Sequence, residues 1–158
     1  MRFEFVKALS VEMQRNDSIF VLLGDLGYGI FDKLRIEFPD RCINVGSSEQ
    51  LMLGMATGMA FEGKIPVCYS ISPFLIYRPF EFIRNYLDHE QVPVKLVGSG
   101  RGTDYMEAGF THYSVELQEI LSHMKNIESF WPETTFEMEN TISSFLYSRK
   151  PSFLSLRR

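Results

Sequence analysis

The sequence lacks the features that define several large classes of protein. It has only two cysteines, Cys42 and Cys68, and they form neither a CxxC pair nor a metal-binding spacing. A disulfide framework is therefore not expected, and neither is a metal site within the chain. No run of about 18 apolar residues occurs, which predicts no transmembrane helix. The net charge is −4 with no basic block, so neither nucleic acid nor a membrane is an expected partner.

The N-terminal segment and the cysteines both indicate a cytoplasmic protein. Glu4 and Glu12 interrupt the apolar pattern of the first 17 residues, which argues against a secretory signal. Cys42 and Cys68 fall in predicted strands, where we expect them to be small buried hydrophobic residues of a reducing compartment.

Length and composition predict one globular domain over residues 1–158. Hydrophobic residues make up 45% of the chain and charged residues 23%. A chain of this length buries a stable core without disulfide bonds or structural metals. Aromatic residues make up 14%, including fourteen phenylalanines. That enrichment indicates an extensive hydrophobic interface or a pocket lined by aromatic rings.

Short apolar segments alternate with helical patterns along the chain. The predicted strands cover 19–25, 42–46, 65–70, 93–98, 126–131 and 151–156. The predicted helices cover 3–16, 30–38, 48–62, 74–88 with a kink or restart at Pro79, 115–124 and 134–147. Because most strands are apolar on both faces, we expect a three-layer α/β/α fold with a mostly parallel, about six-stranded sheet.

In such folds ligands bind beyond the carboxyl ends of the strands. Four segments are expected at that edge: GDLGYG, GSSEQ, SISPF and GSGRGTDYMEAGFTH. The first lacks the GK[ST] ending of a phosphate-binding P-loop. The last does not match GxGxxG and leads into a long loop rather than a helix, so a dinucleotide site is not expected.

Glu49, in INVGSSEQ, stands at the start of a helix that is apolar almost all round. One interpretation is capping, with Ser47 or Ser48 as the N-cap and Glu49 in the first turn, where the helix dipole favours a carboxylate. The other is an acid/base role, because a carboxyl group at the tip of a buried helix can, when protonated, donate a hydrogen bond to a ring nitrogen. The local sequence leaves both open.

Phe74, Tyr77 and Phe80 recur nearly on one helix face. They are interpreted either as core packing or as a platform on which a flat heterocycle stacks. His112 is the one histidine in a loop at the ligand edge. It is either a loop residue without a role in binding or a residue that contacts substrate. His89 and His123 fall near helix ends, where the helix dipole accounts for them.

The combination resembles the pyrimidine-binding domain of transketolase-like thiamine diphosphate enzymes. The resemblance covers the stretch from GDLGYG through INVGSSEQLMLGMATG to SPFLIYRPFEFIRN, then MEAGFTHYSVE and the closing PSFLSLRR. It implies that Glu49 hydrogen-bonds the aminopyrimidine ring nitrogen of thiamine diphosphate and favours the imino tautomer. The nitrogen of that tautomer removes the thiazolium C2 proton, which gives the nucleophilic ylide.

The resemblance also implies roles for the other candidates. Phe74, Tyr77 and Phe80 match the aromatic pocket around the pyrimidine. Asp25 and Leu26 match a D-L pair near the cofactor, and His112 matches a histidine that contacts the sugar substrate or intermediate. The expected function is that of a transketolase-type subunit for ketol transfer.

Two departures from the family pattern shape the expected assembly. The GDG…N segment that binds diphosphate and Mg²⁺ is not found in these residues, so the resemblance implies a separate diphosphate-binding subunit that holds the metal. The glycine-spaced helix that starts at Glu49 is the predicted assembly surface, and self-association is left open. The loop has Glu107-Ala108-Gly109 where E-D-G is usual, which weakens the inference of a sugar substrate. The substrate-side loops leave open a ketose or aldose phosphate or a 2-oxoacid. The alternatives are therefore a 2-oxoacid decarboxylase subunit or a non-catalytic domain that stabilises a partner.

Overall fold

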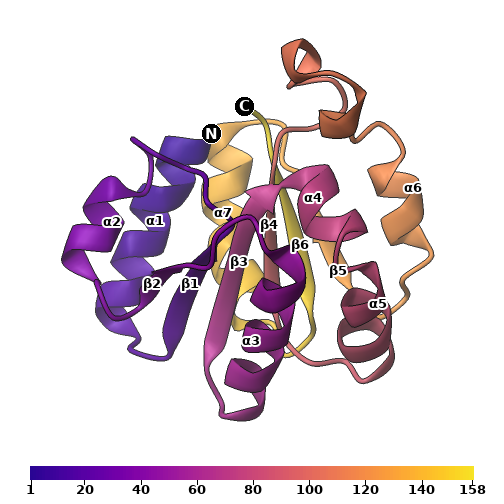
Figure 1. Ribbon diagram of the computed structural model, residues 1–158. Coiled ribbons are helices and arrows are strands. Elements are labelled where there is room, and N and C mark those ends of the chain that lie inside the picture. The colour runs from indigo at the N-terminus through magenta and orange to yellow at the C-terminus, as the bar shows by residue number, and fades with distance from the viewer.

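The computed structural model describes residues 1–158, and its centre is one six-stranded parallel sheet (Figure 1). The strand order is β2-β1-β3-β4-β6-β5, and every neighbouring pair is parallel. The strands are β1 (Ile19–Leu23), β2 (Cys42–Asn44), β3 (Ile65–Ile71), β4 (Lys95–Ser99), β5 (Glu128–Phe130) and β6 (Ser152–Leu156). Four of them lie within the predicted segments, and β3 and β4 each extend one residue beyond theirs. The predicted fold class is confirmed.

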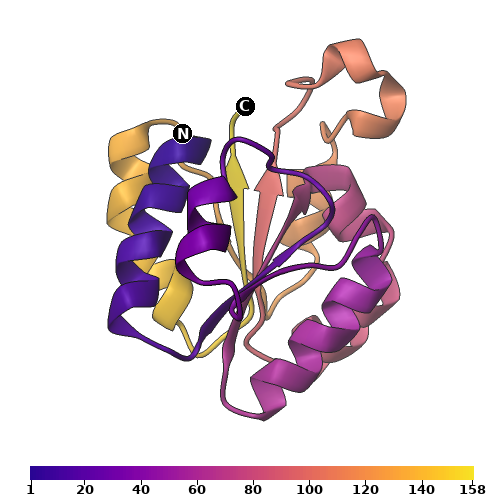
Figure 2. The same ribbon diagram turned by 60° about the vertical axis from the view of Figure 1, so that its left-hand side comes forward.

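Helices cover both faces of the sheet, as Figure 2 shows. On one face lie α1 (Arg2–Arg15), α2 (Asp32–Glu37) and α7 (Thr135–Tyr147). On the other lie α3 (Glu49–Phe61), α4 (Ser72–Tyr77), α5 (Phe80–Phe82), the π-helix η1 (Ile83–His89) and α6 (Leu117–Ser122). Each face buries its own apolar cluster, so burial on both sides of the sheet holds the three layers together.

Two predicted elements differ from the structure in a way that matters for the site. The restart predicted at Pro79 is confirmed, because Pro79 has no backbone N–H to continue α4. The helix predicted over 74–88 differs in that it begins at Ser72 and continues from α5 into the π-helix η1. The loop after β4 contains two short 3₁₀ turns, η2 (Met106–Ala108) and η3 (Phe110–His112). The predicted stop of α3 at Gly63 is confirmed: Gly63 has φ 73°, and the Lys64 N–H bonds back to the Met59 carbonyl.

The strand order places the site. The chain runs from β1 to β2 on one side and then crosses to β3 on the other side of β1. The loops that follow these three strands therefore meet at the reversal, which is where open α/β sheets bind ligands. Glu49 follows β2, and Ser70 lies in β3 near its carboxyl end.

Both cysteines are buried and free, as the sequence predicts. Burial raises the pKa of the Cys42 thiol to about 11, and burial also raises the pKa of Cys68. Neither thiol is therefore a reactive nucleophile at neutral pH. No helix of the chain combines the length and the apolar character that a membrane span requires.

Candidate active site

Glu49 is a buried carboxylate held by two donors from other elements. It is the first residue of α3, and only 2% of its surface is exposed. The Ser70 hydroxyl donates to its Oε1 at 2.9 Å, and Nη1 of Arg78 donates to its Oε2 at 2.7 Å. Burial of a carboxylate is costly unless donors compensate it, and these two bonds supply that compensation.

The capping interpretation explains the position of Glu49 but not the direction of its side chain. Ser48 is the N-cap of α3, yet its side chain makes no capping hydrogen bond. The Glu49 carboxylate likewise turns to Ser70 of β3 and Arg78 beyond α4. It thus links three elements that belong to different parts of the chain.

A glycine makes room for the bond between Ser70 and Glu49. A Cβ on Gly24 would lie 3.0 Å from Ser70 Oγ and 3.2 Å from Met52 Cε, both closer than ordinary side-chain contacts. Gly24 follows β1, so the loop after the neighbouring strand packs directly against the donor of Glu49. The GDLGYG segment therefore contributes to the site through close packing.

The three aromatic candidates differ in their surroundings. Phe74 is half-buried, with the Arg78 guanidinium 3.8 Å from its ring centroid and the His112 ring edge-on at 4.8 Å. Tyr77 is half-buried, and its hydroxyl donates to Glu116 Oε1 at 2.8 Å. Phe80 lies beyond the break at Pro79 and is 39% exposed. Core packing alone does not account for a set in which no ring is fully buried.

The Tyr77 hydroxyl joins the aromatic helix to the end of the long loop. Burial, and then the hydrogen bond to the Glu116 carboxylate, raises the pKa of Tyr77. The phenol therefore stays neutral and acts as a donor over the physiological range. Glu116 precedes α6, so this bond fixes the loop that carries His112.

His112 ends η3 and is brought to the site through Phe74. Its Nδ1 lies 3.0 Å from the Thr111 hydroxyl, and its ring is 6.4 Å from that of Tyr105. The Tyr105 hydroxyl is in turn 2.6 Å from Ser99 Oγ at the end of β4. The loop is thus held against the carboxyl edge of the sheet.

Asp25 and Leu26 lie at the same edge, but no hydrogen bond joins them to Glu49. Asp25 is exposed with φ 54°, and its carboxylate accepts from the Tyr28 hydroxyl at 2.6 Å and from Asn44 Nδ2 at 3.0 Å. The Tyr28 bond first, and then the Asn44 bond, lowers the pKa of Asp25. Leu26 packs on the core between the sheet and α1. Asn44 therefore ties the loop after β1 to the end of β2.

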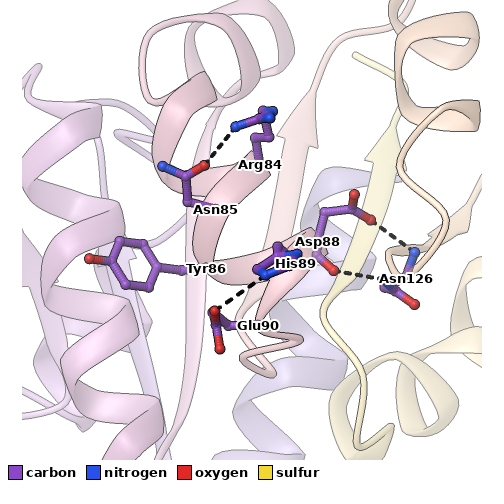
Figure 3. Close-up of a pocket in the computed structure, with 7 residues that line it drawn as sticks. All are labelled: Arg84, Asn85, Tyr86, Asp88, His89, Glu90 and Asn126. Atoms are coloured by element: carbon purple, nitrogen blue, oxygen red, sulfur yellow. Dashed lines mark hydrogen bonds and ion pairs between the residues drawn. The ribbon is translucent and has the colours of Figure 1, made fainter.

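A second hollow, of about 570 Å³, lies away from all of these residues. Figure 3 shows that residues of η1 line it together with Glu90, which follows η1, and Asn126, which precedes β5 and bonds twice to Asp88. It contains none of the candidate residues. The hollow that contains Glu49 and Arg78 has about 520 Å³ and is also lined by Ser47, Ser48, Gln50 and Leu51.

Sequence reasoning did not single out Arg78, Ser70 or Glu116. Arg78 stands four residues after Phe74, so helical spacing places both side chains on one face. Ser70 carried a weaker signal, as a hydroxyl at the end of an otherwise apolar strand. The pairing of Tyr77 with Glu116 spans 39 residues, and nothing in the local sequence indicates it.

The arrangement can bind a flat, nitrogen-containing ring. Each carboxylate oxygen of Glu49 has one donor and a second lone pair for a ring N–H. The half-buried ring of Phe74 lies 3.8 Å from the guanidinium of Arg78, which bonds this carboxylate. No group of three His, Cys, Asp or Glu side chains in the chain is placed to hold a metal ion.

Comparison with known proteins gives a consistent result. The family model for the transketolase pyrimidine-binding domain matches residues 1–158. One of the subunits of the apulose-4-phosphate transketolase from Actinobacillus succinogenes is 33% identical over 120 residues, which is 76% of this chain and 39% of that protein. The 6-deoxy-6-sulfo-D-fructose transketolase subunit SqwH of Clostridium sp. strain MSTE9 is 28% identical over 159 residues, 100% of this chain and 49% of that protein.

A solved structure of a split-gene transketolase, described as an inactive β4 tetramer, superimposes with a TM-score of 0.87. It is 27% identical, and the match covers 99% of this chain and 50% of that one. The chain therefore spans about two fifths to one half of the length of these relatives.

Proposed function

Because the chain belongs to the transketolase pyrimidine-binding domain family, we propose that residues 1–158 form a single pyrimidine-binding domain in a subunit of a heteromeric thiamine diphosphate enzyme. The proposed reaction is transketolase-type ketol transfer on ketose or aldose phosphates. The named relatives act, by their names, on apulose-4-phosphate and on 6-deoxy-6-sulfo-D-fructose.

One observation carries the proposal: the Glu49 carboxylate is buried beside a half-exposed aromatic helix, between donors from β3 and from the end of α4. This donor set fits an aminopyrimidine, because the carboxylate can accept from a protonated ring nitrogen and the neighbouring rings provide apolar walls. A purely structural glutamate in the first turn of a helix would have no need of such surroundings.

Thiamine diphosphate, when bound, supplies the nucleophilic carbon of the thiazolium ring. The side chains of this domain bind and orient it. Glu49 holds or gives a proton at the ring nitrogen, and Phe74, Tyr77 and Phe80 flank the ring. Asp25 and Leu26 are proposed to lie near the cofactor, and His112 to contact the substrate.

A separate diphosphate-binding subunit is proposed to hold Mg²⁺ and the diphosphate. The proposed contact is the α3 stripe, defined as Leu51, Gly54, Gly58 and Phe61, which follow one another at helical spacing. Leu51 is 55% and Phe61 67% exposed, and nothing lies within 4 Å of a Cβ built on Gly58, whereas Gly54 faces the Phe82 ring of α5. Self-association through the same stripe is the alternative. The proposed compartment is the cytoplasm, which two free buried thiols support.

The test replaces Glu49 by glutamine in the chain mixed with a partner that carries GDG and a downstream asparagine, sought first in the neighbouring reading frame. Glutamine keeps the volume and the acceptor for Ser70 but cannot exchange a proton, so we expect normal folding and a loss of activity of about 10²–10⁴-fold. Full activity of Glu49→Gln would refute the role. The same assay with a 2-oxoacid separates ketol transfer from decarboxylation, and no turnover of either would favour a non-catalytic domain.

A further inference from the structure

Arg78 contacts Glu49 and Phe74, two of the residues that are proposed to bind the aminopyrimidine. Its Nη1 donates to Glu49 Oε2 at 2.7 Å, and its Cζ lies 3.8 Å from the Phe74 ring centroid. Phe74 and Arg78 are four residues apart at the end of α4, so their side chains lie one above the other. One guanidinium thus bonds the carboxylate and stacks on the ring at the same time.

A guanidinium and an aminopyrimidine make the same kinds of contact. Both are flat, both present N–H groups in their plane, and both stack on aromatic faces. The His112 ring approaches Phe74 edge-on, so the stacking contact with Phe74 belongs to Arg78. A ring that binds both Glu49 and Phe74 therefore competes with the Arg78 side chain.

The exposure of the two partners gives the order in which an incoming group meets them. The Arg78 side chain is 45% exposed and that of Glu49 only 1%. Both line the same hollow of about 520 Å³. Arg78 is therefore the outer layer over the carboxylate. Its length and partial exposure let it move into solvent without disturbing the core.

We infer that Arg78 is a positioning residue that occupies the place of the heterocycle on Glu49 and Phe74, and that it leaves the Phe74 face when the heterocycle binds. The inference rests on the proposed function. While it is in place, Arg78 compensates the buried carboxylate. When it leaves, the protonated ring nitrogen of the heterocycle donates to the carboxylate in its place. The apparent affinity for the heterocycle is reduced by the fraction of molecules in which Arg78 occupies the site.

Removal of Arg78 therefore has two effects of opposite sign. The free chain loses stability, because Glu49 stays buried with Ser70 as its remaining donor. Binding of the heterocycle becomes tighter, because its competitor is gone. A residue that only supports Glu49 would weaken both stability and binding when it is removed.

The test uses Arg78→Met, which keeps the length of the side chain without its charge. Arg84→Met is the matched control, since Arg84 is an exposed arginine of η1 that bonds only to the neighbouring Asn85. The isolated, isotope-labelled chain is titrated with thiamine and followed by NMR. We expect a lower Tm for Arg78→Met together with a Kd for thiamine roughly tenfold lower than in the wild type. Arg84→Met should change neither.

The Arg78 guanidinium resonance supplies a second measure in the wild type. Its ring-current shift from Phe74 should disappear as thiamine saturates the chain, and an unchanged resonance at saturation would overturn the inference. Thiamine binding by Arg78→Met that is equal to or weaker than that of the wild type would also overturn the inference. In that case the proposed function still stands if Glu49→Gln abolishes thiamine binding. Absence of thiamine binding in both the wild type and Arg78→Met overturns the inference. Binding that is indifferent to Glu49→Gln removes the proposed function with it.

Discussion

Ser70 Oγ donates to Glu49 Oε1 at 2.9 Å, and this bond joins β3 to the first turn of α3 across the point where the sheet topology reverses. Ser70 is fully buried and Glu49 nearly so. The bond holds a carboxylate at the edge where ligands of this fold class bind. The orientation of that carboxylate is therefore determined by the packing of two strands and one helix, and substitutions in those elements should act on it.

Gly24→Ala should disturb the Ser70–Glu49 bond. Its Cβ would lie 3.0 Å from Ser70 Oγ, and we expect the free energy of unfolding to fall by about 1–2 kcal/mol, as in overpacked cores. Cofactor affinity should fall as well. Gly58→Ala is the control: its Cβ meets nothing within 4 Å, and alanine should stabilise α3 by roughly 0.5–1 kcal/mol. Urea unfolding of the two variants measures the contrast, and equal stabilities would contradict it.

Phe61→Ser should weaken assembly without weakening the fold. Phe61 belongs to the α3 stripe and is 67% exposed, so its removal costs little within the chain. If the stripe meets a partner, the loss of this ring should lower the affinity by about tenfold. Ile36→Ser is the control, since Ile36 is 81% exposed on α2, on the other face of the sheet. Sedimentation of the mixed subunits measures the affinity of each variant for the partner. Equal losses of affinity in Phe61→Ser and Ile36→Ser would show that the stripe is not the contact.

Tyr77→Phe should loosen the loop that carries His112. The change removes the hydroxyl that donates to Glu116 at 2.8 Å and keeps the ring. Chymotrypsin should then cleave faster at Phe110, which is 83% exposed in that loop. Tyr86→Phe is the matched control, because Tyr86 is 39% exposed on η1, away from the loop. The same cleavage rate in Tyr77→Phe and wild type would argue that the bond does not restrain the loop.

The contribution of Lys95 to the unfolding free energy should rise with pH. This lysine is 1% exposed, its ammonium donates to the Ser148 and Lys150 carbonyls at 2.7 Å, and burial lowers its pKa to about 8. The nearby Glu128 carboxylate opposes that shift. Between pH 8 and pH 10 the unfolded chain holds the lysine proton and the folded chain releases it. Lys95 alone therefore adds about 1 kcal/mol to the unfolding free energy from pH 7 to pH 9. The buried thiols Cys42 and Cys68 act in the opposite direction, because burial raises their pKa values.

Lys95→Met provides the reference for this rise. Methionine cannot titrate, so the unfolding free energy of the wild type minus that of Lys95→Met should increase by about 1 kcal/mol between pH 7 and pH 9 in urea unfolding. Lys95→Met should also be less stable than the wild type at pH 9, because two carbonyls lose their donor. A parallel pH dependence in the two proteins would assign the effect to other groups.

The fold was predictable because its signals are local. Apolar strand segments, the stop at Gly63 and the break at Pro79 each follow from residue types that act within a few positions. The edge of the sheet that carries Glu49 also followed, since a parallel sheet puts the ends of all its strands together.

The partners of the candidate residues were not predictable in the same way. Ser70 and Arg78 lie 21 and 29 residues from Glu49, and their contacts depend on how β3 and α4 pack against α3. The pairing of Tyr77 with Glu116 depends likewise on the course of a long loop. Such contacts come from tertiary packing, which residue spacing along the chain does not encode.

The most direct measurement is a calorimetric titration of thiamine diphosphate with Mg²⁺ into the chain alone, into the partner alone and into the mixture, with wild type and Glu49→Ala. The account predicts tight binding by the mixture that Glu49→Ala abolishes, and far weaker binding by either component alone. Equal binding by the partner alone, indifferent to Glu49, would contradict it and would leave Glu49 as the first residue of a helix.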